Sequence, residues 1–378
     1  MSDPLTSYFV TCAKGLEECV AAELRSEAIG AQEVAVGSAG VLFQGTRATG
    51  YSANLWLRTG VRVLAEFARQ TVVGPEELYE WAGTLDWQGC LRVGQTFSVE
   101  ARVWDSEVTH SKYAALRVKD ALCDYFRAKT GRRPMVDVEA ADLPLYLYLY
   151  RDEAILYRDL SGTTLHKRGY RGAMHKAPLN ECVAAGILQL AGWEGQGTFC
   201  DPMCGSGVFA IEAALRRLHR APGLLRKRFP FESWPDFDKE LWKELKGQAY
   251  GRAKYEAPCA ILANDCHPGA LALARKDAEA AGVAEFIQFF QTDVATFAPP
   301  EPPRLVAVNP PWGERLKLAD LAEPWRKLGA FLTQHCAGAE AWVLSGNPEA
   351  PGHLGLKEEC SLPLQLGKVP CQVFKYKI

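Results

Sequence analysis

Hydrophobic and polar positions in the first 165 residues follow two periods, one typical of strands and the other of amphipathic helices. The strand-like segments are residues 8–11, 33–37, 40–44, 61–72, 95–104, 145–150 and 154–159, the last two forming a hairpin. Helical spacing occurs at residues 16–28, in a segment that ends near residue 57, and at residues 112–129, with Leu116, Leu122 and Phe126 on the buried side of the last. This order indicates a small α+β sandwich with helices on one face of a mainly antiparallel sheet.

From about residue 178 the pattern changes to short apolar strands that alternate with longer helices, which is typical of a doubly wound parallel sheet. The expected strands are residues 198–200, 260–264, 286–291, 304–308 and 341–345. The expected helices are residues 179–190, 206–218, 269–281 and 325–336. A segment rich in tryptophan and basic residues, at about 220–257, interrupts the alternation, and residues 372–377 suit a terminal antiparallel edge strand.

Length and composition narrow the class of protein. A chain of 378 residues, 48% hydrophobic and 23% charged, is expected to fold into two or three globular domains. Its longest apolar runs are too short to cross a bilayer, and residues 1–8 lack the features of a secretory signal. The 12 cysteines show neither disulfide-framework nor zinc-site spacing. We therefore expect a cytoplasmic protein with reduced thiols, no membrane association and no metal site.

The formal net charge of −2 exerts no overall attraction on nucleic acid, so any such binding must come from local patches. One basic patch lies at residues 216–228 and contains no acid, and a second lies at residues 166–176. Considered alone, each patch is as compatible with a solvated surface as with phosphate binding.

The segment Asp201-Pro202-Met203-Cys204-Gly205-Ser206-Gly207 joins a predicted strand to a predicted helix. Glycines there allow a ligand to approach the backbone, and a helix N-terminus offers unpaired N–H groups. Residues 205–210 also fit a permissive dinucleotide fingerprint, but Asp201 would repel a pyrophosphate. An acid at the strand end instead suits the ammonium and sulfonium of S-adenosylmethionine.

Two further acids, Asp265 and Asp293, directly follow predicted strands. Ligands of doubly wound sheets bind over the carboxyl ends of the strands. Asp265 is placed to accept hydrogen bonds from ribose hydroxyls, and Asp293 from an adenine amine. The alternative is that each is a helix cap or a turn residue, which is common for aspartate. Three acids in succession at strand ends favour the ligand interpretation.

The segment Asn309-Pro310-Pro311-Trp312 follows the next predicted strand. The prolines stiffen the loop and contribute no backbone donors, so Asn309 and the Pro310 carbonyl present acceptors. Trp312 adds a flat aromatic face. This combination suits a planar base with an exocyclic amine, whose lone pair would be aimed at a methyl donor. An ordinary tight loop is the alternative.

The glycine loop, residues 307–316 and the segment 166–181 together resemble the THUMP-domain RNA guanine-N2 methyltransferases. The likeness is greatest to the L type, which acts on 23S ribosomal RNA and whose relatives are often labelled N6-adenine-specific DNA methylases. The resemblance implies a class I (Rossmann-like) methyltransferase domain at residues 166–378, with an insert at about 220–257 beside the target-base pocket. Before it come a ferredoxin-like segment at residues 1–67 and a THUMP RNA-binding domain at residues 68–165, together an α+β module. One methyltransferase domain, and one activity, are expected.

The resemblance also assigns residues. Those expected to hold S-adenosylmethionine are Pro178, Asp201, Pro202, Cys204, Gly205, Gly207, Asp265, Asp293 and Asn309. Those expected to receive the flipped base are Asn309, Pro310, Pro311 and Trp312, with tryptophan where relatives commonly have tyrosine. Those expected to contact RNA are Lys112, Lys119, Lys167, Arg168, Arg171, Arg226, Lys227 and Arg228. No obligate protein partner is implied. For Trp234 and Trp242 of the insert we favour packing over base stacking.

The resulting hypothesis is an S-adenosylmethionine-dependent enzyme that forms N2-methylguanine in 23S ribosomal RNA. One alternative keeps the chemistry and changes the substrate to transfer RNA. Another is adenine-N6 methylation of DNA, because an Asn-Pro-Pro-aromatic loop also serves adenine. A third is a non-catalytic RNA-binding factor, which the intact Asp201, Asp265 and Asn309 disfavour.

Overall fold

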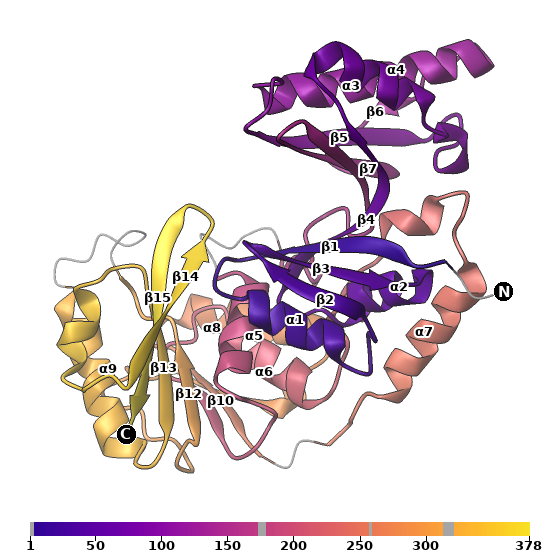
Figure 1. Ribbon diagram of the computed structural model, residues 1–378. Helices are drawn as coiled ribbons and strands as arrows, with labels where there is room; N and C mark the ends of the chain where they lie inside the picture. Colours follow the sequence, from indigo (N-terminus) through magenta and orange to yellow (C-terminus); the bar gives the residue numbers. More distant parts are fainter. Residues whose placement is uncertain (1–3, 173–178, 257–258, 313–320) are drawn as a thin grey trace.

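Two β-sheets, one in each half of the chain, organise the protein (Figure 1). The computed structural model describes residues 4–172, 179–256, 259–312 and 321–378. Among these residues, no helix has both the length and the apolar character that crossing a membrane requires.

The N-terminal sheet has eight strands in the order β2-β3-β1-β4-β8-β7-β5-β6. Its strands are β1 (Thr6–Cys12), β2 (Gln32–Gly37), β3 (Gly40–Gly45), β4 (Gly60–Thr71), β5 (Thr96–Trp104), β6 (Met135–Val136), β7 (Leu143–Tyr150) and β8 (Glu153–Asp159). All neighbours are antiparallel except the pairs of β5 with β7 and with β6. The predicted strands and the mainly antiparallel sheet are confirmed.

Strand β4 makes the eight strands one continuous sheet. Its first half pairs with β1 and its second half with β8, and the register shifts between Glu66 and Ala68. A bulge of this kind bends a strand and increases its twist. Residue 67, where the sequence placed a domain boundary, therefore lies at a bend inside a strand. Beyond the bend the sheet continues into the upper lobe of Figure 1, which contains β5, β6 and β7.

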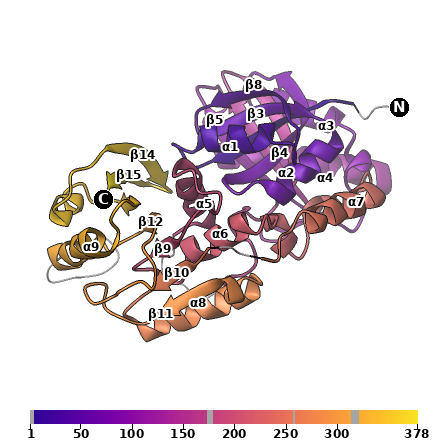
Figure 2. The ribbon, with the colours of Figure 1, turned by 90° about the horizontal axis from the view of Figure 1, so that it is seen from below.

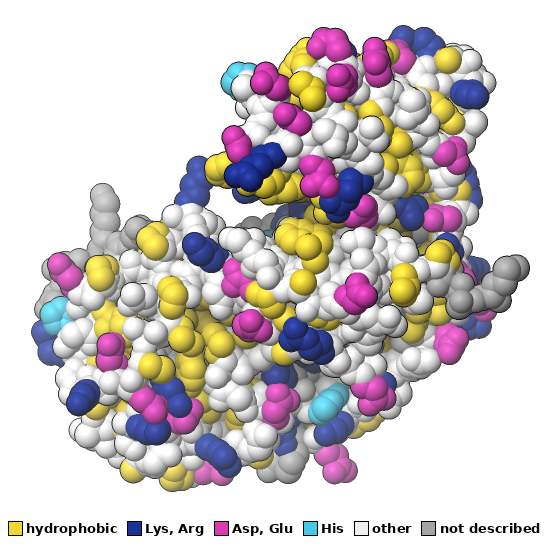
Figure 3. Space-filling view, in the orientation of Figure 1, with side chains coloured by type: hydrophobic (Ala, Val, Ile, Leu, Met, Phe, Trp, Pro, Cys, Tyr) yellow, Lys and Arg dark blue, Asp and Glu magenta, His cyan; other side chains and the backbone are white. Residues whose placement is uncertain are grey.

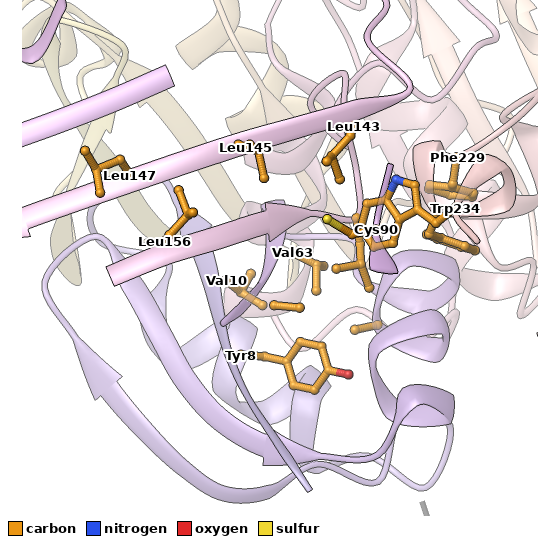
Figure 4. Close-up of a cluster of buried hydrophobic side chains, with 14 of the residues drawn as sticks. Tyr8, Val10, Val63, Cys90, Leu143, Leu145, Leu147, Leu156, Phe229 and Trp234 are labelled. Atoms are coloured by element: carbon orange, nitrogen blue, oxygen red, sulfur yellow. The ribbon is translucent and has the colours of Figure 1, made fainter. Parts of the chain in front are cut away.

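Helices cover one face of this sheet. They are α1 (Glu17–Arg25), α2 (Arg47–Trp56), α3 (Gly74–Thr84), which the sequence did not predict, and α4 (Ser111–Thr130). Strand β7 alternates leucine with tyrosine, and Leu143, Leu145 and Leu147 point into the core beneath the helices (Figure 4). The prediction that Leu116 is buried was wrong: it is 48% exposed, because α4 turns Ala114 and Val118 inward instead.

The C-terminal sheet has seven strands in the order β11-β10-β9-β12-β13-β15-β14. Its strands are β9 (Phe199–Asp201), β10 (Ile261–Asn264), β11 (Ile287–Phe290), β12 (Leu305–Val308), β13 (Glu340–Ser345), β14 (Cys360–Leu366) and β15 (Val369–Lys377). Strands β9 to β13 are parallel, as expected. Strand β15 is antiparallel but not at the edge, because the unpredicted β14 pairs along its outer side.

Helices lie on both faces of the C-terminal sheet (Figure 2). They are α5 (Glu181–Leu190), α6 (Val208–Arg217), α8 (Pro268–Ala280) and α9 (Ala322–His335). Ala307 packs in the cluster that includes α5, α6 and α8, whereas its neighbours Val306 and Val308 pack in the cluster that includes α9. Both faces of these strands are buried, which explains why their sequences are almost continuously apolar.

The described part of the basic, tryptophan-rich segment, residues 220–256, packs against the N-terminal half. It contains α7 (Lys239–Gly251), and Phe231 stacks on Tyr51 of α2 with ring centroids 4.3 Å apart. Trp234 and Trp242 are 5% and 4% exposed, and Figure 4 shows Trp234 in the N-terminal core. Packing of both tryptophans is confirmed. The segment therefore helps to join the two halves of the chain, and its expected place beside a target-base pocket stays a prediction.

Candidate functional site

The carboxyl ends of β9, β10, β11 and β12 meet at one edge of the C-terminal sheet because these strands are parallel neighbours. The glycine loop follows β9, Asp265 follows β10, Asp293 comes shortly after β11 and Asn309 follows β12. The structure thus brings the predicted site segments to the same edge. Direct contact joins two of them, since the Gly205 N–H donates to Asp265 Oδ2 over 2.8 Å.

Asn264 ties these loops together, and sequence reasoning missed it. Its side chain is fully buried, and its amide donates to the carbonyls of Pro202 (2.9 Å) and Thr292 (3.1 Å). Its Oδ1 accepts from the Thr292 N–H at 3.1 Å and hydroxyl at 2.8 Å. The Cys204 N–H donates to the Asn264 backbone carbonyl over 2.8 Å. A polar residue closing the apolar strand β10, directly before Asp265, was the available signal.

The Asp201 carboxyl is buried, with 2% exposure. Burial raises the pKa of Asp201 well above its usual range, the Met203 N–H at 3.3 Å opposes this, and the nearby Asp265 charge adds to it. A buried carboxylate is favourable when a positive group lies against it. Asp201 is therefore suited to hold a cationic ligand.

The glycines of the loop have different roles. Gly205 has a φ of +53°, and a Cβ there would meet no atom within 4 Å, so the loop faces open space at this residue. Gly207 has a φ of +77°, and a Cβ there would lie 3.0 Å from the Ala274 side chain. Gly207 thus permits close packing of α6 on α8. Cys204 is 6% exposed, burial raises the pKa of its thiol well above its usual range, and the thiol contacts the Gly205 carbonyl within the loop over 3.7 Å.

Asp265 and Asp293 also make the turn contacts of the alternative interpretation. The Asp265 Oδ1 accepts from the His267 N–H, and the Asp293 Oδ1 from the Ala295 N–H, over 2.8 and 2.9 Å. Lys327 of α9 lies 2.9 Å from Asp293 Oδ2, and this contact, with the Ala295 N–H, lowers the Asp293 pKa. Each carboxylate is thus held in place by the protein itself, through a contact in its own loop and one with a neighbouring segment.

The Asn-Pro-Pro-Trp loop differs from expectation in one residue. Trp312 is 6% exposed, and its Nε1–H donates to Asn309 Oδ1 over 3.0 Å. Its ring packs against Gly346, where a Cβ would lie 2.6 Å away, and Trp325 Nε1 donates to the Pro311 carbonyl over 2.9 Å. The expected exposed aromatic face at Trp312 is therefore corrected: the indole is inside and contacts the amide of Asn309.

Two of the arginines expected to meet RNA lie inside the protein. Arg168 is 1% exposed, its Nε lies 3.4 Å from Glu212 of α6, and its guanidinium donates to the carbonyl of Leu165 over 2.9 Å and to that of Arg58. Arg171, with a side chain 9% exposed, donates to the Leu179 carbonyl over 2.7 Å. Arg168 thus joins the two halves, and Arg171 ties the connecting segment to the start of α5, so we leave both out of the RNA surface.

The other basic residues that were expected to contact RNA fall into two groups, those paired within the protein and those that are exposed. Arg226 donates to the backbone carbonyls of Ser161, Thr163, Thr164 and Lys167, which shapes the connecting segment. Arg228 is 57% exposed and pairs with Asp142 at 3.0 Å, and Lys119 pairs with Asp120. Lys112, Lys167 and Lys227 are exposed.

Two further points concern cofactors and metals. Pro178, which was expected to hold the cofactor, lies outside the described residues. Among the described residues no group of three or more histidine, cysteine or acidic side chains could hold a metal ion.

Comparisons with known families cover nearly the whole chain. The family model for the RMKL-like methyltransferase domain matches residues 168–371, more than half of the chain. Models for the RlmL ferredoxin-like domain and the THUMP domain match residues 7–64 and 75–159.

Curated relatives include the ribosomal RNA large subunit methyltransferase K/L of Syntrophotalea carbinolica, which is 38% identical over 388 residues. The alignment covers 100% of this chain and 54% of that protein, so the chain spans about half the length of the K/L relatives it matches. A Synechocystis protein, provisionally named an RNA methyltransferase, is 33% identical, and the alignment covers 98% of this chain and 96% of that protein.

Solved structures show the same architecture. One, provisionally named a methyltransferase and complexed with SAH, superposes with a TM-score of 0.87 at 27% identity, over 100% of this chain and 99% of its own. Another, a predicted N6-adenine-specific DNA methylase of Listeria monocytogenes, also has a TM-score of 0.87, at 29% identity, and the coverage is 99% and 96%.

Proposed function

The chain belongs to the RMKL-like methyltransferase family, and from that premise we propose that it methylates the exocyclic amine of a guanine in large-subunit ribosomal RNA. The product is N2-methylguanine and the methyl donor is S-adenosylmethionine. The observation that carries the proposal is the edge of the C-terminal sheet, where the buried Asp201, the open glycine loop and Asn309 follow neighbouring strands.

The residues at this edge fit the donor. S-adenosylmethionine supplies a methyl group activated by a sulfonium, and SAH, found in the solved relative, is what methyl transfer leaves. Asp201 offers a buried carboxylate for an ammonium group, and Gly205 leaves open space in front of the loop. Asp265 and Asp293 would bind ribose hydroxyls and the adenine amine.

Asn309 would hold the target amine. Its Oδ1 accepts from the Trp312 indole, and a carbonyl oxygen has a second lone pair that can accept from the base. Prolines 310 and 311 keep the loop stiff, and the Trp325 indole anchors the Pro311 carbonyl. The amine lone pair is then oriented for attack, and the proton it releases passes to solvent. Positioning supplies most of the acceleration in such a reaction, and no strong general base is needed.

The RNA substrate is supported by the THUMP match and by the names of the relatives. The test is transfer of a labelled methyl group, in parallel, to ribosomal RNA, transfer RNA and DNA, with nucleoside analysis of each product. We expect N2-methylguanine in large-subunit RNA. Label confined to transfer RNA would contradict the substrate, and N6-methyladenine in DNA would contradict both the base and the nucleic acid.

A further inference from the structure

The face of the eight-stranded sheet opposite the helices carries a row of aromatic side chains. In β7 the tyrosines at 146, 148 and 150 alternate with the buried leucines, so they point away from the helical face. Leu64, Ile155 and Tyr157 form a small buried cluster on this face, with Tyr146 and Tyr148 packed against it and partly exposed. No helix among the described residues contributes to that cluster.

The row extends onto the neighbouring strand. Parallel pairing of β5 with β7 places Trp104 beside Tyr150 and Arg102 beside Tyr148. Trp104 is 61% exposed and Tyr150 38% exposed, and the Tyr148 and Tyr150 ring centroids are 6.5 Å apart. We call Arg102, Trp104, Tyr146, Tyr148 and Tyr150 the tyrosine face.

Two cavities adjoin the tyrosine face. The larger, about 990 Å³, is lined by Ser98 and Glu100 of β5 and by Lys167 and Arg228. The smaller, about 570 Å³, is lined by Arg102, Lys14 of the N-terminal half, Asn180 at the start of α5, and Gln365 of the C-terminal half. The smaller cavity thus joins the tyrosine face to the catalytic half. Figure 3 shows a hollow between the upper lobe and the rest of the molecule, with hydrophobic, Lys or Arg, and some Asp or Glu side chains along its upper edge.

Charge in the smaller cavity favours an anionic occupant. Its lining contains two cations, Lys14 and Arg102, and no carboxylate residue among the described side chains. Within the described part of the chain neither Lys14 nor Arg102 forms an ion pair, and both side chains are exposed. A guanidinium beside aromatic rings can pair with phosphates while bases stack on the rings.

We propose that the tyrosine face binds an unpaired segment of the RNA substrate, with bases on the aromatic rings and phosphates at Arg102 and Lys14. The proposal rests on the proposed function and adds where the RNA is held and that it is single-stranded there. Residues two apart in a strand are separated by about 6.8 Å, which suits one splayed base for each tyrosine. A duplex keeps its bases stacked inside and cannot use such a surface.

The test is fluorescence anisotropy of labelled RNA of about 12 nucleotides, as a single strand and as a duplex of the same sequence. Trp104 and Tyr150 are exposed, so the double variant Trp104→Ala/Tyr150→Ala should fold, and its melting temperature checks this. We expect the double variant to bind the single strand about tenfold or more weakly. Arg102→Ala should flatten the salt dependence of binding. The matched control is Tyr113→Ala, a tyrosine 45% exposed on α4 of the same lobe.

The control variant should bind as the wild type does. Unchanged affinity in the double variant, or tighter binding of the duplex than of the single strand, would overturn the proposal. So would a wild-type dimer that the double variant converts to a monomer, because a second copy would then occupy the tyrosine face. Methyl transfer to RNA is measured with the same variants. If the wild type and the double variant transfer the methyl group equally well, the proposed function stands and only the role of the tyrosine face is refuted.

Discussion

The indole N–H of Trp312 donates a hydrogen bond of 3.0 Å to the side-chain carbonyl of Asn309. The indole is 6% exposed and packed against Gly346, so it is held in place independently of any substrate. The contact occupies one of two acceptor positions on Asn309 Oδ1 and orients the other. If Asn309 holds the target amine as proposed, Trp312 would act on that amine through Asn309, as a positioning residue.

Replacing Trp312 by phenylalanine keeps a ring in the same place and removes the donor. A lost hydrogen bond of about 1 kcal/mol should lower kcat about fivefold, because Asn309 is then free to rotate. Cofactor affinity, measured by titration calorimetry, should be unchanged because Trp312 contacts Asn309, whose proposed role is to hold the target amine. An unaltered kcat would show that the indole does not orient Asn309.

The variant Asn309→Ala should abolish methyl transfer and leave cofactor affinity nearly unchanged. The reason is that the role proposed for its side chain is to accept a hydrogen bond from the target amine. Single-turnover transfer to RNA measures the first effect and calorimetry the second. Equal loss of cofactor binding would assign Asn309 to the cofactor instead.

The variant Asn264→Ala should loosen the glycine loop. It removes the amide contacts to Pro202 and Thr292 and leaves buried partners unsatisfied, at a cost of about 2–4 kcal/mol in unfolding free energy. Cofactor affinity should fall as well, because Pro202 begins the loop. Urea unfolding and calorimetry check the two effects. A stable variant with weak cofactor binding would still support the role in the loop, whereas normal values of both would refute it.

Arg168→Ala should destabilise the protein without changing how RNA binding depends on salt. It leaves Glu212 as an uncompensated buried charge, which typically costs about 3–5 kcal/mol. The matched control is Arg228→Ala, whose side chain is 57% exposed and whose effect on unfolding should stay below about 1 kcal/mol. Similar unfolding free energies for the two variants would mean that the Arg168 ion pair contributes no stability.

The Asp201 carboxyl should make stability depend on pH. Its pKa in the folded protein is raised by burial, so the folded state binds the proton more tightly than the unfolded state. Its contribution is therefore most favourable below the unfolded pKa of about 3.8 and is lost as pH rises through the raised folded value. Asp201→Asn should gain stability relative to wild type on going from about pH 5 to about pH 8, in urea unfolding without cofactor. A gain that is independent of pH would show that Asp201 does not titrate there.

The order of elements and the strand-end positions of Asp201, Asp265 and Asn309 followed from the sequence, because periodicity and turn residues act over a few neighbours. The burial and contacts of individual side chains depend on distant segments and did not follow from the sequence. Arg168 and Arg228 look alike in a basic stretch, yet one is buried against Glu212 and the other is exposed. That difference arises from how the two halves pack, which no local pattern contains.

The packing of distant segments also explains the burial of the Trp312 indole and the internal position of β15. The indole turns inward because Gly346, on a different strand end, leaves room for it, and β15 is internal because β14 pairs outside it. The tyrosine alternation of β7 was visible in the sequence, but only the sheet showed that its tyrosines adjoin Trp104 and Arg102. Local spacing therefore determined which polar residues stand at the strand ends, and tertiary packing decided which of the candidate residues are buried and which are exposed.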